Sequence, residues 1–368
     1  METPARPVDT PVPPVETPVL HRLALNESPY PPLRSVRGAM RRAAARAHRY
    51  PQFYPDDLTE AVAAWCGVGP EQVAVGSGSV GVALQLLRAA AGPGDTVVHA
   101  WRTFDAYPLL ARMTGARSVP VPLTADGHQD LDGLLAAIDQ RTRVVVLCSP
   151  HNPTGSLVPP GALREFLHRV PRHVIVVLDE AYVEFARGVR LPDVIALSAA
   201  HPNLLVLRTF SKAYGLAALR VGYGLGGAEL VARIREQQLP FGVNAVATAA
   251  VRASLRAGDE LRARVERIVA ERDRLRDELA GLGWRVGAGH ANSVWLAAPD
   301  PVDRAAAALA AAGVQARHYP GEGVRLTVGG RAANDAVLAA LSHGAALSHA
   351  GDRGHAGDRG HAGDRQLV

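Results

Sequence analysis

The 368-residue chain contains a single lysine, Lys212, although lysine and arginine together number 40, so that 39 of these residues are arginine. The two residue types are interchangeable on a hydrated surface, but only a lysine amine can lose its proton and attack an aldehyde or ketone. A GC-rich genome would explain the arginines. It would not explain why Lys212 follows the apolar run 204–207 and lies among small and hydroxyl residues. We therefore expect Lys212 to be a catalytic amine.

Cysteine and long apolar runs are also scarce. Cys66 and Cys148 are the two cysteines, and they form neither a disulfide framework nor a metal-ligand spacing, which predicts a cytoplasmic protein without a metal site. No apolar run approaches about 18 residues, so no membrane span is expected. The first residues are prolines and acids rather than the basic and apolar regions of a signal peptide. The net charge of +5 is spread out, and its densest cluster, residues 34–49, has the spacing of a hydrated helix face rather than a nucleic-acid patch.

Both ends of the chain have compositions that cannot bury an apolar face. Residues 1–20 are rich in proline, threonine and valine, and residues 346–368 repeat the unit His-Ala-Gly-Asp-Arg-Gly. We expect a disordered arm and a disordered tail. The length between them exceeds one comfortable core and indicates about two domains.

Apolar strands alternate with helical segments in the middle of the chain. The predicted strands are residues 73–75, 96–99, 118–121, 143–148, 174–178, 204–207 and 221–225. Strands that are apolar throughout are buried on both faces, so this α/β rhythm predicts a mostly parallel sheet covered by helices. One long amphipathic helical stretch, residues 245–282, then leads into a smaller α+β domain. Its predicted strands are residues 293–297, 315–318 and 324–328.

A turn rich in glycine and serine, residues 76–81, connects the first predicted strand to a helix at 82–90. Backbone N–H groups and a helix dipole meet there, which suits an anion such as phosphate. Tight glycine turns without a ligand are equally common, and the spacing matches neither the dinucleotide fingerprint nor Walker A.

Polar residues follow the predicted strand ends, which form the ligand-binding edge of an open α/β sheet. They are Ser77, Asn152, Asp179, Tyr182, Ser211 and Lys212. A carboxylate directly after five apolar residues, as in Asp179, is costly without a cationic partner. A lysine for a Schiff base, a phosphate turn and a buried acid together fit pyridoxal phosphate, which needs a partner for its aldehyde, its phosphate and its pyridine nitrogen.

The chain also resembles the fold type I pyridoxal-phosphate aminotransferases of the histidinol-phosphate and aromatic amino acid branch, over residues 21–345. The motifs are Asn26-Glu27-Ser28-Pro29-Tyr30, Arg49-Tyr50-Pro51, Asn152-Pro153-Thr154-Gly155, Asp179-Glu180-Ala181-Tyr182, Ser211-Lys212 with Arg220, and Arg325-Leu326-Thr327-Val328-Gly329. The resemblance implies a large cofactor-binding domain at 51–245 and a small domain at 246–345. It also implies that the segment 21–50 packs with the small domain and a dimer partner.

The resemblance implies that Lys212, Asp179 and Tyr182 are the catalytic residues. Lys212 would bond the cofactor and shuttle a proton between substrate and cofactor. Asp179 would pair with the pyridinium nitrogen, whereas Tyr182 and Asn152 would hydrogen-bond the cofactor's 3′-oxygen and keep the lysine free to act as a base.

The remaining carried-over residues bind the cofactor or the substrate. Those expected around the cofactor's phosphate are Gly78, Ser79, Val80, Thr209, Ser211 and Arg220. Phe104 would lie against the cofactor ring, with a plain core position as the less favoured alternative. Tyr50 would reach the phosphate in the neighbouring subunit of a homodimer, and the nearby Tyr54 could be mistaken for it. Arg325 would bind the substrate's carboxylate or phosphate, with Asn152 beside it and Tyr30 closing the pocket.

Two positions favour an aromatic amino acid over histidinol phosphate as the donor. The phosphate turn has Val80-Gly81 where histidinol-phosphate enzymes commonly have an acid pair, and Ala336 stands where many have a second arginine. A dianionic phosphate usually needs more than one cation, whereas a carboxylate needs one arginine. We therefore predict transamination of a phenylalanine-type substrate with 2-oxoglutarate, with histidinol-phosphate transamination as the alternative.

Three other hypotheses remain open. Decarboxylation or β-elimination would use the same cofactor, but Arg325 argues for a retained carboxylate. A metabolite-sensing regulator would carry an added DNA-binding domain, which neither end of the chain can form. A cofactor-free aldolase would need the lysine but not the phosphate turn or Asp179.

Overall fold

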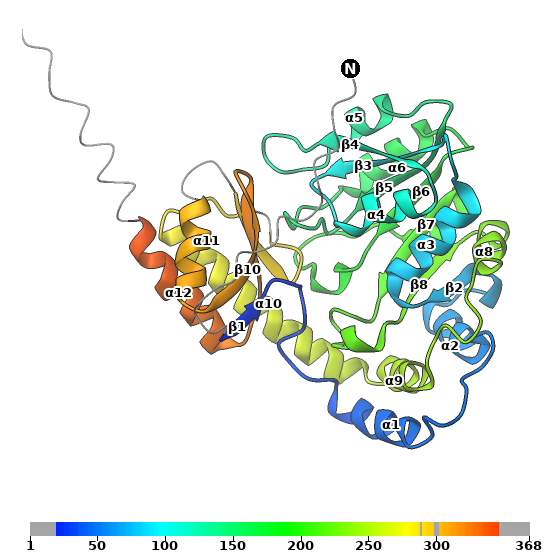
Figure 1. The fold of residues 1–368 in the computed structure, drawn as a ribbon, viewed down its shortest axis with the longest axis horizontal. Helices are drawn as coiled ribbons and strands as arrows, with labels where there is room; N and C mark the ends of the chain where they lie inside the picture. The colour runs from blue at the N-terminus through cyan, green and yellow to red at the C-terminus, as the bar shows by residue number, and fades with distance from the viewer. Residues whose placement is uncertain (1–19, 288, 298–301, 346–368) are drawn as a thin grey trace, which may run out of the picture.

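The computed structural model describes residues 20–287, 289–297 and 302–345. The predicted tail, and the predicted arm apart from Leu20, lie outside these described residues. The described chain contains a seven-stranded sheet and a four-stranded sheet (Figure 1). The predicted α/β class with a mostly parallel sheet is confirmed, whereas the predicted domain boundaries remain predictions.

The larger sheet has the strand order β2-β8-β7-β6-β5-β3-β4. These strands are β2 (Val73–Gly76), β3 (Thr96–Trp101), β4 (Arg117–Pro122), β5 (Thr142–Cys148), β6 (Ile175–Asp179), β7 (Leu204–Thr209) and β8 (Gly222–Gly226). All neighbours pair in parallel except β8, which is antiparallel to both β2 and β7. The carboxyl ends of β2, β3, β4, β5, β6 and β7 therefore lie along one edge.

Helices cover both faces of this sheet because its central strands alternate between two apolar clusters. Val176 and Leu178 of β6 join one cluster, and Ile175 and Val177 join the other. The first cluster includes residues of α2 (Asp56–Cys66), α5 (Leu131–Ala136), α6 (Pro160–Arg169) and α7 (Val194–Ala200). The second includes residues of α3 (Gly78–Ala90), α4 (Ala106–Met113) and α8 (Ala228–Arg235). Short 3₁₀ turns are η1 (Pro70–Gln72), η2 (Val183–Phe185) and η3 (Ala217–Leu219).

The smaller sheet has the order β1-β10-β11-β9 and draws its strands from both ends of the described chain. Its strands are β1 (His21–Leu23), β9 (Ser293–Ala297), β10 (Val314–Tyr319) and β11 (Gly323–Thr327). Three helices lie beside it in Figure 1, namely α10 (Gly258–Gly281), α11 (Val302–Ala311) and α12 (Arg331–Ala345). Strand β1 pairs in parallel with β10, so the N-terminal segment joins this sheet.

The helical stretch predicted over residues 245–282 consists of two helices. Helix α9 (Ala245–Leu255) packs beside α1 (Arg34–Ala44), and α10 starts afresh at Gly258. Ala257, at φ −101° and ψ 37°, leaves the helical conformation. Asp259 and Glu260 in the first turn of α10 suit the positive end of a helix dipole, which favours a new start there.

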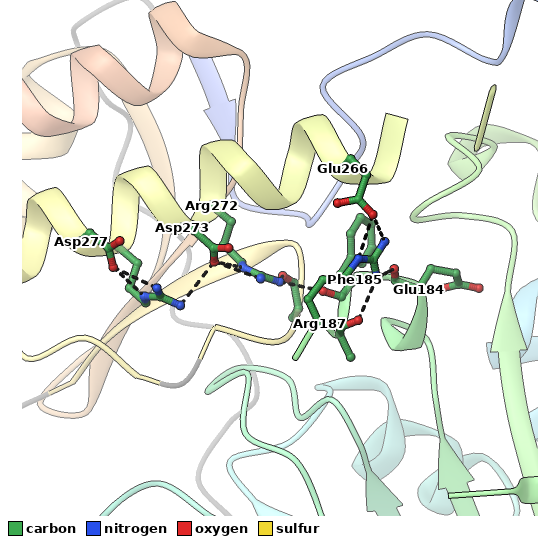
Figure 2. Close-up of polar contacts among 10 residues, drawn as sticks. Glu184, Phe185, Arg187, Glu266, Arg272, Asp273 and Asp277 are labelled. Atoms are coloured by element: carbon green, nitrogen blue, oxygen red, sulfur yellow. Dashed lines mark hydrogen bonds and ion pairs between the residues drawn. The ribbon is translucent and has the colours of Figure 1, made fainter. Parts of the chain in front are cut away.

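Polar contacts attach α10 to the segment that follows β6 (Figure 2). The Arg272 guanidinium is buried and donates from Nη1 to the Phe185 carbonyl at 2.9 Å. Arg187 donates from Nε to Glu266 Oε1 at 2.9 Å. A buried guanidinium that satisfies backbone carbonyls is expensive to separate from them, so this attachment fixes α10 against the larger sheet.

None of the helices among the described residues is long and apolar enough to cross a membrane.

Truncation of a core leucine tests the central position of β6. Leu178 is 0% exposed, and Leu178→Ala should lower the free energy of unfolding by about 2–5 kcal/mol because it leaves a cavity between the sheet and its helices. The matched control Leu109→Ala, at a position 43% exposed, should cost less than about 0.5 kcal/mol. Urea unfolding followed by circular dichroism measures both. Equal losses for the two variants would contradict this packing.

Candidate active site

The carboxyl edge of the larger sheet brings together polar residues that are far apart in the sequence. Asp179 is the last residue of β6, and Lys212 follows β7. Asn152 lies in the turn after β5, and α3 begins at Gly78 directly beyond β2. The predicted ligand edge therefore carries a lysine, an acid, an amide and a helix N-terminus.

Lys212 is partly buried at this edge. Its Nζ donates to the Leu25 carbonyl at 3.0 Å and lies 5.8 Å from the centroid of the Tyr182 ring. Burial, followed in size by the positive charge of Arg325, lowers the pKa of the amine from 10.5 to about 8. A substantial fraction of this lysine is therefore neutral and nucleophilic near physiological pH.

Asp179 is buried and accepts two hydrogen bonds. The Tyr107 hydroxyl donates to Oδ2 at 2.6 Å, and the Ala181 amide donates to Oδ1 at 3.0 Å. Burial raises the pKa of the carboxyl, and the bond from Tyr107 opposes this rise. No ion pair to Asp179 occurs among the described residues. A buried acid without a cationic side chain leaves a place for a cationic group of a ligand.

Two further side chains link the sheet edge to the N-terminal segment. The Tyr182 hydroxyl accepts from Asn26 Nδ2 at 3.0 Å, and burial raises the pKa of this phenol. Arg325 donates from Nη1 to Asn152 Oδ1 and from Nη2 to the Ala24 carbonyl. Because both acceptors are neutral, the charge of Arg325 remains available to an anion.

The N-terminus of α3 faces Arg220. The helix starts at Gly78 rather than at residue 82, so Ser79 and Val80 lie in its first turn, where backbone N–H groups lack helical partners. Gly78 has φ +77°, and a Cβ added there would lie 2.5 Å from Arg220 Nη2. Only glycine allows the guanidinium to approach this turn so closely, which gives a cradle of donors and positive charge for an anion.

Hydroxyl groups from the β7 end complete the cradle. Thr209 Oγ1 donates to Ser211 Oγ at 3.0 Å, and Arg220 Nη1 donates to the same Oγ at 3.3 Å. Five predicted phosphate residues thus converge with Arg220 at one point of the edge. Arginine is the residue best suited to bidentate contacts with a phosphate.

Three other predicted site residues, Phe104, Tyr30 and Tyr50, lie outside the phosphate cradle. Phe104 packs edge-on to Tyr107, with ring centroids 6.0 Å apart, and is therefore next to the partner of Asp179. The Tyr30 ring lies 4.7 Å from the Arg267 guanidinium. Tyr50 is 84% exposed.

The sequence analysis did not predict that Tyr107 contacts Asp179. It also did not predict that residues 24–26 contact Arg325, Lys212 and Tyr182. Tyr107 and Asp179 are 72 residues apart, and Asn26 and Tyr182 are 156 apart. No local pattern encodes such pairs. A signal for Asn26 was present in the motif 26–30, but it did not reveal which group the amide contacts.

The residues present fit pyridoxal phosphate. The amine of Lys212 suits its aldehyde, the uncompensated Asp179 suits its ring nitrogen, and the cradle at Gly78 and Arg220 suits its phosphate. No cluster of three or more potential metal ligands occurs in the part of the chain that the structure describes.

Comparisons with known proteins agree with this geometry. The family model for aminotransferase class I and II matches residues 19–341. An aromatic amino acid aminotransferase from Thermobifida fusca is 50% identical over 317 residues, covering 86% of this chain and 88% of that protein. Proteins with the same name from Streptomyces coelicolor and Cutibacterium acnes are 48% and 47% identical, cover 87% of this chain, and are themselves covered to 89% and 91%.

A solved structure shares both the fold and the cofactor. The histidinol-phosphate aminotransferase of Sinorhizobium meliloti, in complex with pyridoxal 5′-phosphate, superposes with a TM-score of 0.83 at 30% identity, covering 90% of this chain and 92% of that one. Family match, identity and site chemistry lead to one conclusion. The chain belongs to the class I and II aminotransferases and is a fold type I enzyme that depends on pyridoxal phosphate.

Proposed function

We propose that this aminotransferase transfers the amino group of an aromatic L-amino acid to 2-oxoglutarate. The observation that carries the proposal is Arg325, a buried guanidinium whose two described acceptors are neutral. The relatives at 47–50% identity that are named aromatic amino acid aminotransferases support it.

The arginines around Arg325 favour a carboxylate over a phosphate. Arg317 lies directly across from Arg325 on β10, but its guanidinium pairs with Asp105 at 2.8 Å. Arg102 is likewise paired with Glu322 at 2.8 Å. A monoanionic carboxylate can be held by Arg325 alone, whereas a dianion would need a second free cation.

Histidinol phosphate is the alternative donor, because the structural relative from Sinorhizobium meliloti is named for it. Position 336, where the sequence analysis looked for a second arginine, is an alanine packed against the hydrophobic core. The α12 helix therefore supplies no charge to the substrate from that position.

The chain's own residues divide the work of transamination. Bound pyridoxal phosphate supplies an aldehyde that exchanges with the substrate amine and a ring that withdraws electrons from the substrate α-carbon. Lys212 would hold the cofactor and, once displaced by the substrate amine, would carry the proton between the substrate α-carbon and C4′ of the cofactor. Asp179 would hold the proton on the ring nitrogen, and Tyr107 would keep that carboxylate oriented. Asn152 and Tyr182 would face the ring oxygen.

Residues of the α3 turn and the β7 end would fix the cofactor without taking part in proton transfer. Gly78, Ser79 and Val80 would offer backbone N–H groups to its phosphate. Thr209 and Ser211 would add hydroxyl groups and Arg220 a guanidinium.

The remaining assignments concern the substrate pocket. Phe104 would lie against the cofactor ring, and Tyr30 would close the pocket above the substrate that Arg325 and Asn152 hold. These two aromatic side chains would exclude water from the reacting carbon.

We also propose a homodimer in which Tyr50 serves the neighbouring subunit. The Tyr50 ring is 84% exposed and lies 4.9 Å from that of Phe241, which also contacts Phe53 at 5.0 Å. Phe53 and Phe241 are 50% and 41% exposed. A cluster of exposed aromatic rings is typical of a protein–protein interface, where Tyr and Phe are enriched.

The pKa of Lys212 predicts how fast the apoenzyme captures its cofactor. A protonated amine cannot attack an aldehyde, so the initial rate should rise about tenfold per pH unit below pH 8 and level off above it. Stopped-flow absorbance at fixed pyridoxal phosphate measures the rate. Arg325→Gln removes a positive charge that disfavours the protonated amine, so the midpoint of the pH–rate profile should move to higher pH. Lys212→Ala provides the blank, and a midpoint near 10.5 in the wild type would contradict the lowered pKa.

Substrate choice is tested by kinetics of the purified enzyme with 2-oxoglutarate. We expect kcat/KM for L-phenylalanine to exceed that for histidinol phosphate by at least about tenfold, because one unpaired arginine suits a carboxylate. Release of carbon dioxide or ammonia is measured in parallel, since either would point to a different reaction on the same cofactor. A higher kcat/KM for histidinol phosphate would reverse the assignment.

The shared site of the dimer is tested by complementation. Tyr50→Ala and Lys212→Ala subunits are mixed and refolded together, so that hybrid dimers contain one site with an intact Lys212 and a Tyr50 from its neighbour. Activity should exceed the sum of the separate variants. The control mixture of Lys212→Ala with Asp179→Asn leaves a defect in each site and should gain nothing. A monomer in sedimentation velocity, or no gain with Tyr50→Ala, would refute the shared site.

A further inference from the structure

Two arginine–carboxylate pairs join the segment after β3 to the β10–β11 hairpin. Arg102 binds Glu322 through two parallel bonds, from Nε to Oε2 at 2.8 Å and from Nη2 to Oε1 at 2.9 Å. Arg317 Nη2 lies 2.8 Å from Asp105 Oδ2. The pairs connect residues 220 and 212 positions apart in the chain. Neither pair takes part in the chemistry described above.

The ring of Tyr319 lies between the two pairs. Arg102 Cζ is 5.4 Å from its centroid and Arg317 Cζ is 5.5 Å from it, so both guanidinium groups meet the same ring. Arg102 also covers Trp101, at 4.4 Å. Tyr319 is 3% exposed. Stacking on aromatic faces limits the rotamers of both arginines, so each arginine loses less conformational entropy when its salt bridge forms.

The sheet register places this arrangement on the same face as Arg325. Directly opposed residues of an antiparallel pair point to one face, and Arg325 is opposite Arg317 on β10 and Trp295 on β9. Tyr319, two residues after Arg317, shares that face. The Trp295 ring lies 5.5 Å from that of Tyr319 and covers Gly323, where any Cβ would overlap it. A movement of this face would therefore move Arg325 as well.

We propose that Arg102, Asp105, Arg317, Tyr319 and Glu322 form a clasp that sets the distance between the substrate-binding arginine and the cofactor edge of the larger sheet. They are positioning residues, because they act on the substrate through Arg325. The inference rests on the proposed role of Arg325 toward the substrate carboxylate.

The clasp supplements the attachment of α10. Contacts of Arg272 and Arg187 fix that helix beside the segment after β6, at a separate place in the molecule (Figure 2). Without the clasp, α10 and the segment 24–26 still join the two sheets, but the smaller sheet could tilt about α10 and carry Arg325 away from Asn152. Apart from Tyr50 of the neighbouring subunit, the residues proposed for the cofactor's ring and phosphate belong to the larger-sheet part of the chain. Loss of the clasp should therefore weaken substrate binding and leave cofactor binding intact.

Charge reversal tests the clasp in the holoenzyme. Arg102→Glu and Glu322→Arg should each raise KM for L-phenylalanine by about three- to tenfold, because each replaces a partly exposed pair with a repulsion. The values of kcat and of Kd for pyridoxal phosphate should stay within about twofold. The double reversal restores an opposite-charge pair and should return KM close to the wild-type value. Arg169→Glu breaks an exposed pair with Asp132 between α6 and α5, neither of which belongs to the clasp, and is the matched control.

Amide hydrogen exchange gives a readout that does not depend on turnover. Peptides covering residues 314–327 should exchange faster in Arg102→Glu than in the wild type or Arg169→Glu, and the double reversal should slow them again. Unchanged KM and exchange in the single variants, or no rescue by the double variant, would overturn the clasp. A parallel loss of kcat, cofactor affinity and Tm would mean a structural role only. If the wild type does not transaminate phenylalanine, the proposed function fails, and the exchange data alone decide on the clasp.

Discussion

The chemistry of this protein depends on a lysine amine that is kept from being fully charged. Desolvation and the positive charge of Arg325 both penalise the ammonium form of Lys212. The same guanidinium is proposed to receive the substrate's carboxylate. Binding of an anion there would cancel part of the charge that suppresses protonation, so substrate binding and the basicity of the lysine are electrostatically linked. An amine that becomes more basic when the substrate arrives is better able to accept the α-proton.

The segment 24–26 holds this arrangement together. Backbone carbonyls of Ala24 and Leu25 accept from Arg325 and Lys212, and the Asn26 side chain donates to Tyr182. The backbone N–H of Asn26 donates to Oγ1 of Thr327, on the smaller sheet, at 2.9 Å. One short piece of irregular chain thus contacts both sheets and the reactive amine. Its position follows from β1, which pairs with β10 immediately before it.

The sequence was sufficient to locate residues whose placement follows from strand order. Lys212, Asp179 and Asn152 each come after an apolar run within a strand, and parallel strands end at a common edge, so their meeting could be predicted. Residues such as Tyr107, which reach the edge from a helix, could not be predicted because their contacts depend on tertiary packing. Tyr50 lies on the surface of a single chain, and only a partner subunit could give it a site.

Several element boundaries and short elements could not be predicted from local propensity. Helix α3 begins four residues earlier than expected because its first turn is glycine and serine, which are poor helix formers in isolation. The break between α9 and α10 lies in a stretch rich in alanine and arginine, whose high helix propensity does not indicate a break. The short β1, α7 and α8 were not predicted at all. In each of these cases packing against the sheets, rather than the sequence pattern, determines the structure.

The replacement of every other lysine by arginine has a practical consequence. Acylating or carbamylating reagents react with neutral amines, and guanidinium groups resist them because they remain protonated. Apart from the α-amino group of the chain, Lys212 is the one amine available, and its lowered pKa makes it reactive under mild conditions. The protein without its cofactor can therefore be labelled with an amine-selective probe at its reactive centre without mutagenesis, and the α-amino group is the one other amine that such a probe would reach.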